Sequence, residues 1–383
     1  MRWVGRFLSC SLILACGMAT SQAQPERLEL VHADELAGER SPLGTVRRLD
    51  GHVVFRQGEA TMRCDHAIQY LEEDRVVFIG NVELARCGQT LRADRVTYLA
   101  REREEWAEGH VVVQDSAREL RAGNLHYREG PEVGWATGSV VLRHLRTRAV
   151  LQADTVVYYR ARGVAEGHGS PRIMQEDSTG VPVFTLTGRT VRWLDDSRLF
   201  QAEGQVRIEQ AGSWATCDSL HFWRSKNVAV LTGNPTTWRR WERMTGERME
   251  WHFAQDSLRE VHVWGKATVV SEGDTLRPGT RQNRVQGDTI RIFFASGDPR
   301  QVEVEGRATA LYYVFEKTEP KGANWVLGDR IRAWIENGRV ERMEVIGAPE
   351  AAEGKYYPER IVSLARQESV VPERPLPSRQ RGL

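Results

Sequence analysis

The sequence has almost no net charge. Across 383 residues, 53 lysines and arginines are offset by 52 aspartates and glutamates, which leaves a formal charge of +1 at pH 7. Nucleic-acid-binding proteins usually carry a marked basic excess, so this balance argues against a nucleic-acid partner. Lysine is scarce in particular, with 5 lysines against 48 arginines. Arginine can hold a phosphate through two parallel hydrogen bonds, but a compositional bias of the source genome would give the same excess.

Long apolar runs are also absent. After the N-terminus no stretch reaches the 18 or so apolar residues that predict a membrane-spanning helix. The N-terminus itself is typical of an export signal, because Arg2 and Arg6 border an apolar stretch that runs from Phe7 to Ala19, and Ser21-Gln22-Ala23 offers small residues to a signal peptidase. We therefore expect residues 1–23 to be a signal peptide and the mature chain to lie outside the cytoplasm, with no transmembrane segment.

Cysteine is too scarce for a disulfide framework. Of the five cysteines, Cys10 and Cys16 fall in the predicted signal, and Cys64, Cys87 and Cys217 remain as an odd number. The sequence Ile13-Leu14-Ala15-Cys16 loosely fits a lipobox. Lipidation at Cys16, which would anchor the mature chain, is thus an alternative to simple cleavage.

Recognisable catalytic and metal-binding motifs are missing as well. The sequence has no Gly-x-Ser-x-Gly elbow, no phosphate-binding loop, no Cys-x-x-Cys and no His-x-x-x-His. Its ten histidines are scattered without the spacing of metal ligands. We predict that the protein is not an enzyme and has no cofactor and no metal site.

What the sequence does contain is an internal repeat marked by glycine. Glycines stand 29 residues apart at Gly51, Gly80, Gly109, Gly138 and Gly167, and again at Gly204 and Gly233, with Gly265, Gly306 and Gly347 at wider spacings. Apolar residues follow most of them two and four positions later, at Val53 and Phe55, Val82 and Leu84, Val111 and Val113, Val140 and Leu142, and Val206 and Ile208. This alternation predicts a half-buried strand after each glycine.

A second strand pattern occurs once in each repeat. Its form is φ-x-A-D-x-φ-x-Y, where φ is apolar, and copies stand at 31–36, 62–65, 91–98, 120–127, 151–158, 186–193, 215–222, 244–251, 285–292 and 326–333. The parity of the apolar positions changes by one across the Asp slot, which predicts a bulge or sharp bend. Isolated aspartates so far apart favour a bend over a calcium site. Cys64 and Cys217 fill the small-residue slot before Asp, so we interpret them as small apolar residues.

Aromatic residues end the second strand of successive repeats, at Tyr98, Tyr127, Tyr158, Trp193, Phe222 and Trp251. They form either a structural ladder or a rim that gates access to the interior. We predict stacked strand pairs over residues 28–347, with insertions near 176–178 and 318–320. Residues 348–383 are predicted to be a tail, largely disordered toward the C-terminus and unstructured from about Gln367.

These repeated strand pairs resemble the OstA-like domain of the LptA-type lipopolysaccharide-transport family, over about residues 28–347. The resemblance implies an all-β fold, a repetitive open V-shaped β-jelly roll whose slot shelters the acyl chains of lipid A. It also implies a periplasmic protein, either free or associated with the outer membrane, that docks through edge strands to other β-jelly-roll Lpt-type proteins or to copies of itself. The chain is longer than a minimal LptA, has expanded C-terminal repeats and is too short for the barrel of LptD, so its role in such a bridge stays open.

The resemblance implies that the inward-facing strand residues contact the lipid. The predicted lining of the slot is Val53, Phe55, Val82, Leu84, Val111, Val113, Val140, Leu142, Val206 and Ile208. The alternative is that these residues fill the closed core of a structural β-solenoid scaffold or an adhesin-like protein of the cell envelope. Trp238-Arg239-Arg240-Trp241 is either a contact for a lipid headgroup or a solvated loop.

Overall fold

The computed structural model describes residues 28–41, 44–194, 199–210, 212–240, 242–254, 257–274, 276–336, 338–348, 351–363 and 365. The predicted signal peptide, Cys16 and the last residues of the predicted tail lie outside this described part. Within it the protein is almost entirely β-strand, as predicted, and it divides into an N-terminal unit, Met1–Arg198, and a C-terminal unit, Leu199–Leu383.

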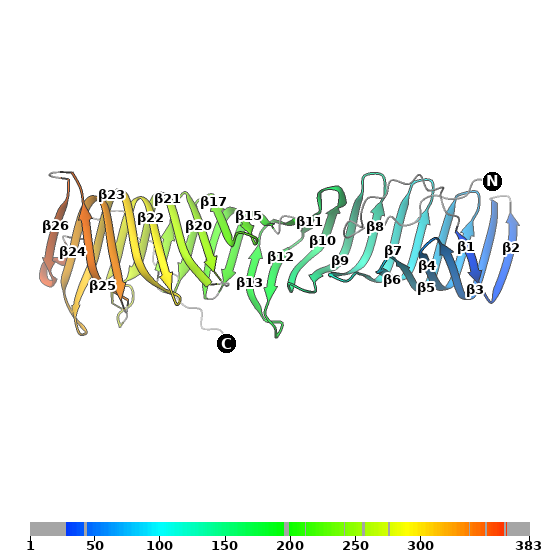
Figure 1. Ribbon diagram of the computed structural model, residues 1–383, viewed down its shortest axis with the longest axis horizontal. Helices are drawn as coiled ribbons and strands as arrows, with labels where there is room; N and C mark the ends of the chain where they lie inside the picture. Colours follow the sequence, from blue (N-terminus) through cyan, green and yellow to red (C-terminus); the bar gives the residue numbers. More distant parts are fainter. Residues whose placement is uncertain are drawn as a thin grey trace. The chain divides into compact units, whose positions relative to one another are not determined.

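The N-terminal unit is an antiparallel series of strands in chain order (Figure 1). Its elements are β1 (Glu29–His32), β2 (Glu35–Ser41), β3 (Gly44–Gln57), β4 (Ala60–Tyr70), β5 (Arg75–Arg86), β6 (Gln89–Leu99), β7 (Glu104–Gln114), β8 (Arg118–Arg128), β9 (Val133–His144), β10 (Ala149–Tyr159), the 3-10 turn η1 (Arg160–Arg162), β11 (Val164–His168), β12 (Arg172–Glu176), β13 (Pro182–Thr187) and β14 (Thr190–Leu194). From β3 to β10 each strand pairs with the next along its whole length.

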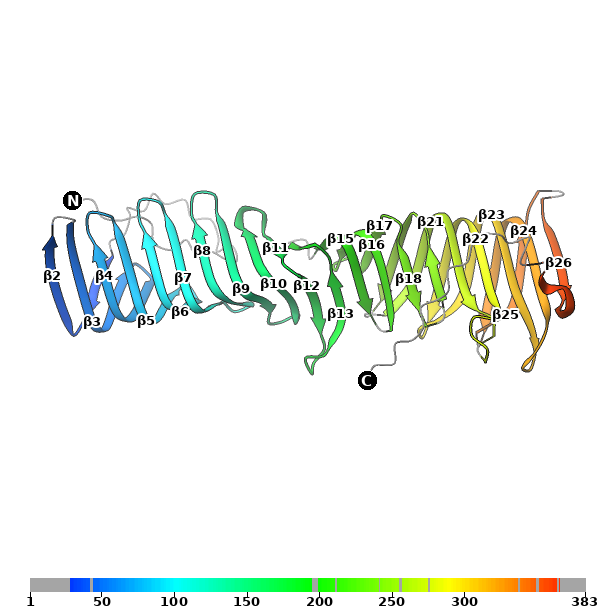
Figure 2. The same cartoon turned by 180° about the vertical axis from the view of Figure 1, so that it is seen from behind.

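Half-length strands replace the long ones after β10. β11 pairs with one half of β10 and β12 with the other half. β12 and β13 form a hairpin, visible beside β10 in Figure 2, whose turn contains the insertion expected near 176–178. Asp177 stabilises this turn by accepting hydrogen bonds from the backbone N–H groups of Thr179 and Val181.

The predicted bend is a β-bulge on every second long strand, the one that carries the glycine, opposite the Asp slot of the next strand. On β5, Ile79 pairs with Arg95 and Val82 with Ala93, so Gly80 and Asn81 together face the single residue Asp94 of β6. Gly80 and Asn81 both have positive φ, +77° and +43°. A β-bulge is formed where two residues of one strand face a single residue of its partner, often with a glycine in the left-handed region. Such a bulge bends the strand.

The bend glycine of the fifth repeat is Gly169, so the prediction of Gly167 was wrong. Gly169, with φ +73°, packs against Asp154 at the bulge, whereas Gly167 lies within β11 opposite Val156. The cause is a turn of different length. Six residues separate the paired Val113 and Leu120, but eight separate Leu142 and Leu151, so the turn between β9 and β10 adds two residues.

The C-terminal unit continues the pattern, first with half-length strands from β17 to β20 and then with longer strands from β21 to β24. Its elements are β15 (Leu199–Gln210), β16 (Ser213–Trp223), β17 (Val228–Thr232), β18 (Thr236–Arg239), β19 (Glu242–Thr245), β20 (Arg248–Ala254), β21 (Ser257–Glu272), β22 (Gln282–Ala295), β23 (Asp298–Glu316), β24 (Glu319–Glu336), β25 (Arg339–Ile346), β26 (Glu353–Pro358) and the 3-10 turn η2 (Glu359–Ile361). The insertion expected near 318–320 falls at the tip of the β23–β24 hairpin.

The strand pairing extends beyond residue 347, the predicted end of the repeats. β25 pairs with one half of β24 and β26 with the other half. Tyr357 and Ala365 then pack with Leu311, Tyr313 and Ala323 in a small separate core. The first part of the predicted tail is therefore built onto the repeat sheet.

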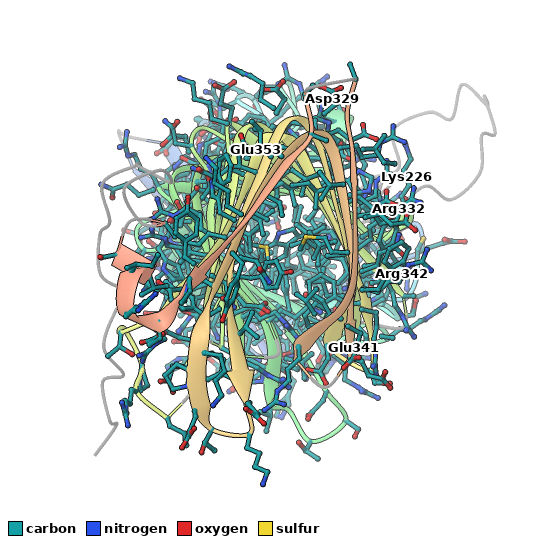
Figure 3. The ribbon with its side chains drawn as sticks, turned by 90° about the vertical axis from the view of Figure 1, so that its left-hand side faces the viewer. Lys226, Asp329, Arg332, Glu341, Arg342 and Glu353 are labelled. Atoms are coloured by element: carbon teal, nitrogen blue, oxygen red, sulfur yellow. The ribbon has the colours of Figure 1, made fainter. Side chains whose placement is uncertain are left out.

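Seen from its end, the C-terminal unit shows how the bends organise the sheet (Figure 3). Asp329 lies at the edge where the strand halves meet, and Glu341 lies near the opposite edge. Arg332 and Arg342 are on the outer side. The outer surface carries cross-strand ion pairs, such as Arg332 Nε to Glu303 Oε1 at 3.0 Å, and the inner surface is apolar.

Candidate functional site

Inward-facing side chains of the N-terminal unit form rows that cross the strands. One row takes a residue from every strand from β3 to β10 and then from β12 and β13, each paired with the next: Phe55, Met62, Leu84, Leu91, Val113, Leu120, Leu142, Leu151, Ile173 and Leu186. All ten are apolar. At about 4.8 Å between neighbouring strands, this row extends for about 43 Å.

The predicted lining residues occupy these inward positions. Nine of them are at most 4% exposed, namely Val53, Phe55, Val82, Leu84, Val111, Val113, Val140, Val206 and Ile208. Leu142 is half-buried and lies beside a small cavity. Burial is expected equally for a lipid slot and for a filled core, so contact with lipid stays a prediction.

The small cavity lies between the two halves of the bent strands. Leu120 and Leu142 line it from one half, and Leu125, Ala136 and Val156 line it from the other. Its volume is about 30 Å³, on the order of the space for one water molecule. The two halves therefore face each other across a common apolar interior, which is narrow in this unit.

A second row explains the recurring aromatic residues. Along it, paired residues alternate in size: Tyr98, Glu105, Tyr127, Gly134, Tyr158, Ala165 and Trp193. Glycine or alanine on the strand between two rings makes room for them, while Glu105 breaks the alternation. This arrangement suits the structural ladder.

Glu105 is an acidic side chain within this apolar interior. It is 9% exposed and pairs across the strands with Tyr98 and Tyr127. Burial raises the pKa of its carboxyl group to about 7, because the charged form loses its water. Period-2 alternation places Glu105 on the same face as the buried Ala107, a signal of its burial that the repeat pattern did not reveal.

The C-terminal unit holds a much larger cavity, of about 440 Å³. Its apolar lining again comes from both halves of the bent strands: Val285 and Ala310 on one side, and Ile292, Val302, Val304, Ile331, Ala333 and Met343 on the other. This volume falls within the roughly 300–1,000 Å³ typical of sites for small ligands. No predicted lining residue lies here, because the sequence pattern gives the facing of a side chain but not the separation of the sheet halves.

Charged residues border this cavity. Arg239 and Arg240 line it together with Glu242, Asp298 and Arg300. Arg240 Nη1 donates to Asp298 Oδ1 at 2.6 Å, and Arg239 Nη1 donates to Glu242 Oε2 at 3.3 Å. Burial raises the pKa of Glu242, although the two arginines oppose that shift. The border is thus a set of ion pairs beside an apolar interior.

The Trp-Arg-Arg-Trp segment is only partly a solvated loop, because Trp238 and Arg239 end β18 and Arg240 lies in the exposed turn that follows. Arg239 is buried, and its guanidinium lies 4.9 Å from the centre of the Phe294 ring. Trp238 stacks on Trp214, with 3.8 Å between the ring centres. Trp241 lies outside the described residues.

The apolar interior reaches the surface at the N-terminal end of the first unit. Leu30 pairs with Phe55 and Leu36 with Leu49, so both leucines continue inward-facing rows. They are nevertheless 42% and 60% exposed, because the described residues supply no further strand to cover them. Among the residues that the structure describes, this end presents both apolar side chains and a strand edge without a partner strand.

Comparison with known proteins agrees with the sequence pattern. Residues 25–136 match the family model described as OstA-like protein. The OstA-like match covers β1 to β8 and the start of β9, less than a third of the sequence. No curated protein matches the chain.

Among solved structures, the chain is similar to LptH of Pseudomonas aeruginosa, described as the LptA-homologous periplasmic component of the lipopolysaccharide transport device. The sequence identity is 15%, the alignment covers 38% of this chain and 95% of LptH, and the TM-score is 0.30. Within the described residues, no helix is long and apolar enough to cross a membrane.

Proposed function

We propose that this protein is a periplasmic, lipid-binding component of a bridge that carries lipopolysaccharide toward the outer membrane. The acyl chains would lie in the apolar interior between the halves of the bent strands. The observation that carries this proposal is the unbroken apolar row from Phe55 to Leu186, together with the cavity of about 440 Å³ in the C-terminal unit. The OstA-like match and the predicted export signal support the compartment. Such a carrier needs no catalytic site.

The energetics of lipid transfer favour this arrangement. Exposing an acyl chain to water costs roughly 0.8 kcal/mol per CH₂, on the order of 10 kcal/mol for one long chain. A row that offers an apolar side chain at every strand removes that cost over its whole length. A lipid could then move from strand to strand without a large barrier at any one step.

The exposed N-terminal end supports docking to a partner. An unpaired strand edge is a template for adding another strand. Leu30 and Leu36 would be buried by such an addition, which would continue the apolar rows into the next molecule. The partner would be another β-jelly-roll protein of the Lpt type or a second copy of this chain.

The alternative is a structural scaffold, and one observation favours it. In the N-terminal unit, Val53 and Phe55 are at most 2% exposed and the cavity is only about 30 Å³. Lipid could enter this unit only if the two strand halves moved apart. A scaffold with a filled core would bind no lipid at all.

Binding of lipid to the C-terminal cavity tests the proposal directly. A fluorescent fatty-acyl probe, displaced by lipopolysaccharide, should bind the purified protein in a saturable manner. Ala310, 2% exposed and part of the cavity lining, would be replaced in Ala310→Phe to fill the space. We expect affinity to fall about tenfold or more, about 1.4 kcal/mol. Thr309→Phe, on the other face of β23, is the control. The proposal fails if the wild type binds no probe or if both variants bind alike.

A further inference from the structure

A cluster of metal-binding side chains lies on the outer face of the C-terminal unit, on β20 and β21. Glu250 and His252 are alternate residues of β20 and therefore lie on one face, opposite to the buried Trp251 between them. His262 of β21 pairs directly with Glu250, and Glu260 pairs with His252. The strand register thus brings together two imidazoles that are ten residues apart in sequence.

The distances suit a single ion. One possible ligand atom from each of Glu250, His252 and His262 lies within 4.8 Å of the other two. His252 Nε2 is 3.4 Å from Glu250 Oε2. Two ligands of a tetrahedral zinc ion, each about 2.1 Å from the metal, are about 3.4 Å apart. One pair of ligand atoms therefore already has the required separation, and His262 needs a shift on the order of 1 Å.

The surroundings orient these side chains. His262 Nε2 is hydrogen-bonded with Glu260 Oε1, and Glu260 also lies 3.4 Å from Arg291 Nε. A carboxylate on one imidazole nitrogen is the usual way in which proteins fix a histidine that binds metal through its other nitrogen. His252 Nε2 is buried and accepts or donates no hydrogen bond within the described structure. Arg248 pairs with the other carboxylate oxygen of Glu250 and leaves Oε2 facing His252.

We propose that Glu250, His252 and His262 form a site for a transition-metal ion of the zinc type. Two imidazole nitrogens and one carboxylate suit Zn²⁺, Co²⁺, Ni²⁺ or Cu²⁺, whereas Ca²⁺ and Mg²⁺ require sets of oxygen ligands. The site holds three protein ligands and leaves room for water as a fourth. It is on the outer face, so it is independent of the proposed lipid-carrying interior. A bound ion would cross-link β20 to β21.

Calorimetric titration of tag-free protein with Zn²⁺ at neutral pH tests the site. We expect one ion per chain, and weakening by about tenfold or more in each of His252→Gln and His262→Gln. His126→Gln is the matched control, because His126 Nε2 lies 3.1 Å from Glu104 Oε2 in the N-terminal unit, without a second histidine in that pair. The control should bind zinc as the wild type does.

A second readout separates loss of a ligand from loss of structure. Co²⁺ bound to the wild type should give the visible absorption of a tetrahedral complex, and each variant should lose it while keeping the far-ultraviolet circular dichroism of the wild type. Acidification to about pH 5 should release the ion, because protons compete for the imidazoles. The site is refuted if the wild type takes up no zinc, or if the two variants bind it as tightly as His126→Gln does.

Discussion

The carboxylate of Asp65 lies against the bare backbone of Gly80: a Cβ atom on this glycine would be only 2.4 Å from Asp65 Oδ2. The same contact recurs between Gly51 and Asp34, Gly109 and Asp94, Gly169 and Asp154, Gly233 and Asp218, and Gly306 and Asp288. The residue after the glycine often adds a hydrogen bond, as Asn81 Nδ2 does to Asp65 Oδ2 at 2.8 Å. Glycine and aspartate therefore recur together at these six bends, whereas Gly138 packs against Gly123 and Gly265 against Glu247.

Gly80→Ala should destabilise the N-terminal unit by about 1–3 kcal/mol, because the new methyl group meets both positive φ and the Asp65 carboxylate. Urea unfolding followed by circular dichroism measures the change. Gly88→Ala is the control: Gly88 has the same φ of +77° but nothing within 4 Å of the added Cβ. It should lose about 1 kcal/mol from backbone strain alone. Equal losses in the two variants would contradict the packing role of Asp65.

The stability of the bend in the first repeat should depend on pH. The hydrogen bond from His52 Nδ1 to Asp34, 2.8 Å long, raises the pKa of His52 above 6.5 and lowers the pKa of Asp34 below 3.8. The stabilisation from His52 is fully present below pH 6.5 and is lost as the pH rises through the higher folded pKa. That from Asp34 is present above pH 3.8 and is lost as the pH falls through its lower folded pKa.

Titration by NMR measures the His52 pKa directly. Asp34→Asn should return it toward the ordinary value, and Asp50→Asn, which removes the partner of His66 instead, should leave it unchanged. If the pKa of His52 is the same in Asp34→Asn as in the wild type, this account of the His52–Asp34 pair is refuted.

Glu105 should make the protein less stable as the pH rises. Its folded pKa of about 7 exceeds the ordinary 4.5, so the folded state binds the extra proton between these values and stability falls from pH 4.5 to 7. The loss is about 3 kcal/mol when fully developed. Glu105→Gln should remove most of it, as measured by urea unfolding at pH 5 and pH 8. Glu108→Gln, an exposed change on the same strand, should keep the wild-type pH dependence; equal pH profiles for both variants would contradict the burial argument.

The sequence predicted the facing of the strands well because period-2 alternation and the Gly-Asp pairs are local features. It predicted the inward position of Val82 and Leu84, and the bulge opposite Asp94. It could not predict the cluster of His252 and His262, because that depends on the register between β20 and β21. Nor could it predict the cavity beside Ala310, because the distance between strand halves depends on how all the facing side chains pack.

Docking through the N-terminal end should depend on Leu36. Leu36→Arg places a charge on the exposed end of an inward-facing row, where a docked strand would bury it at high cost. We expect weaker self-association, or weaker binding to an Lpt-type partner, in analytical ultracentrifugation. Leu276→Arg is the control, since Leu276 is 71% exposed in a loop of the C-terminal unit. Equal association of the two variants would place docking elsewhere.

Site-specific photo-crosslinking in cells that make lipopolysaccharide tests the central claim most directly. A photoreactive residue would replace Val140, which faces inward and is 1% exposed, or its outward-facing neighbour Val141. The account predicts a lipopolysaccharide adduct at position 140 and none at 141. Adducts at neither position, in protein that is folded and exported, would show that the interior is a filled core and would contradict lipid transport.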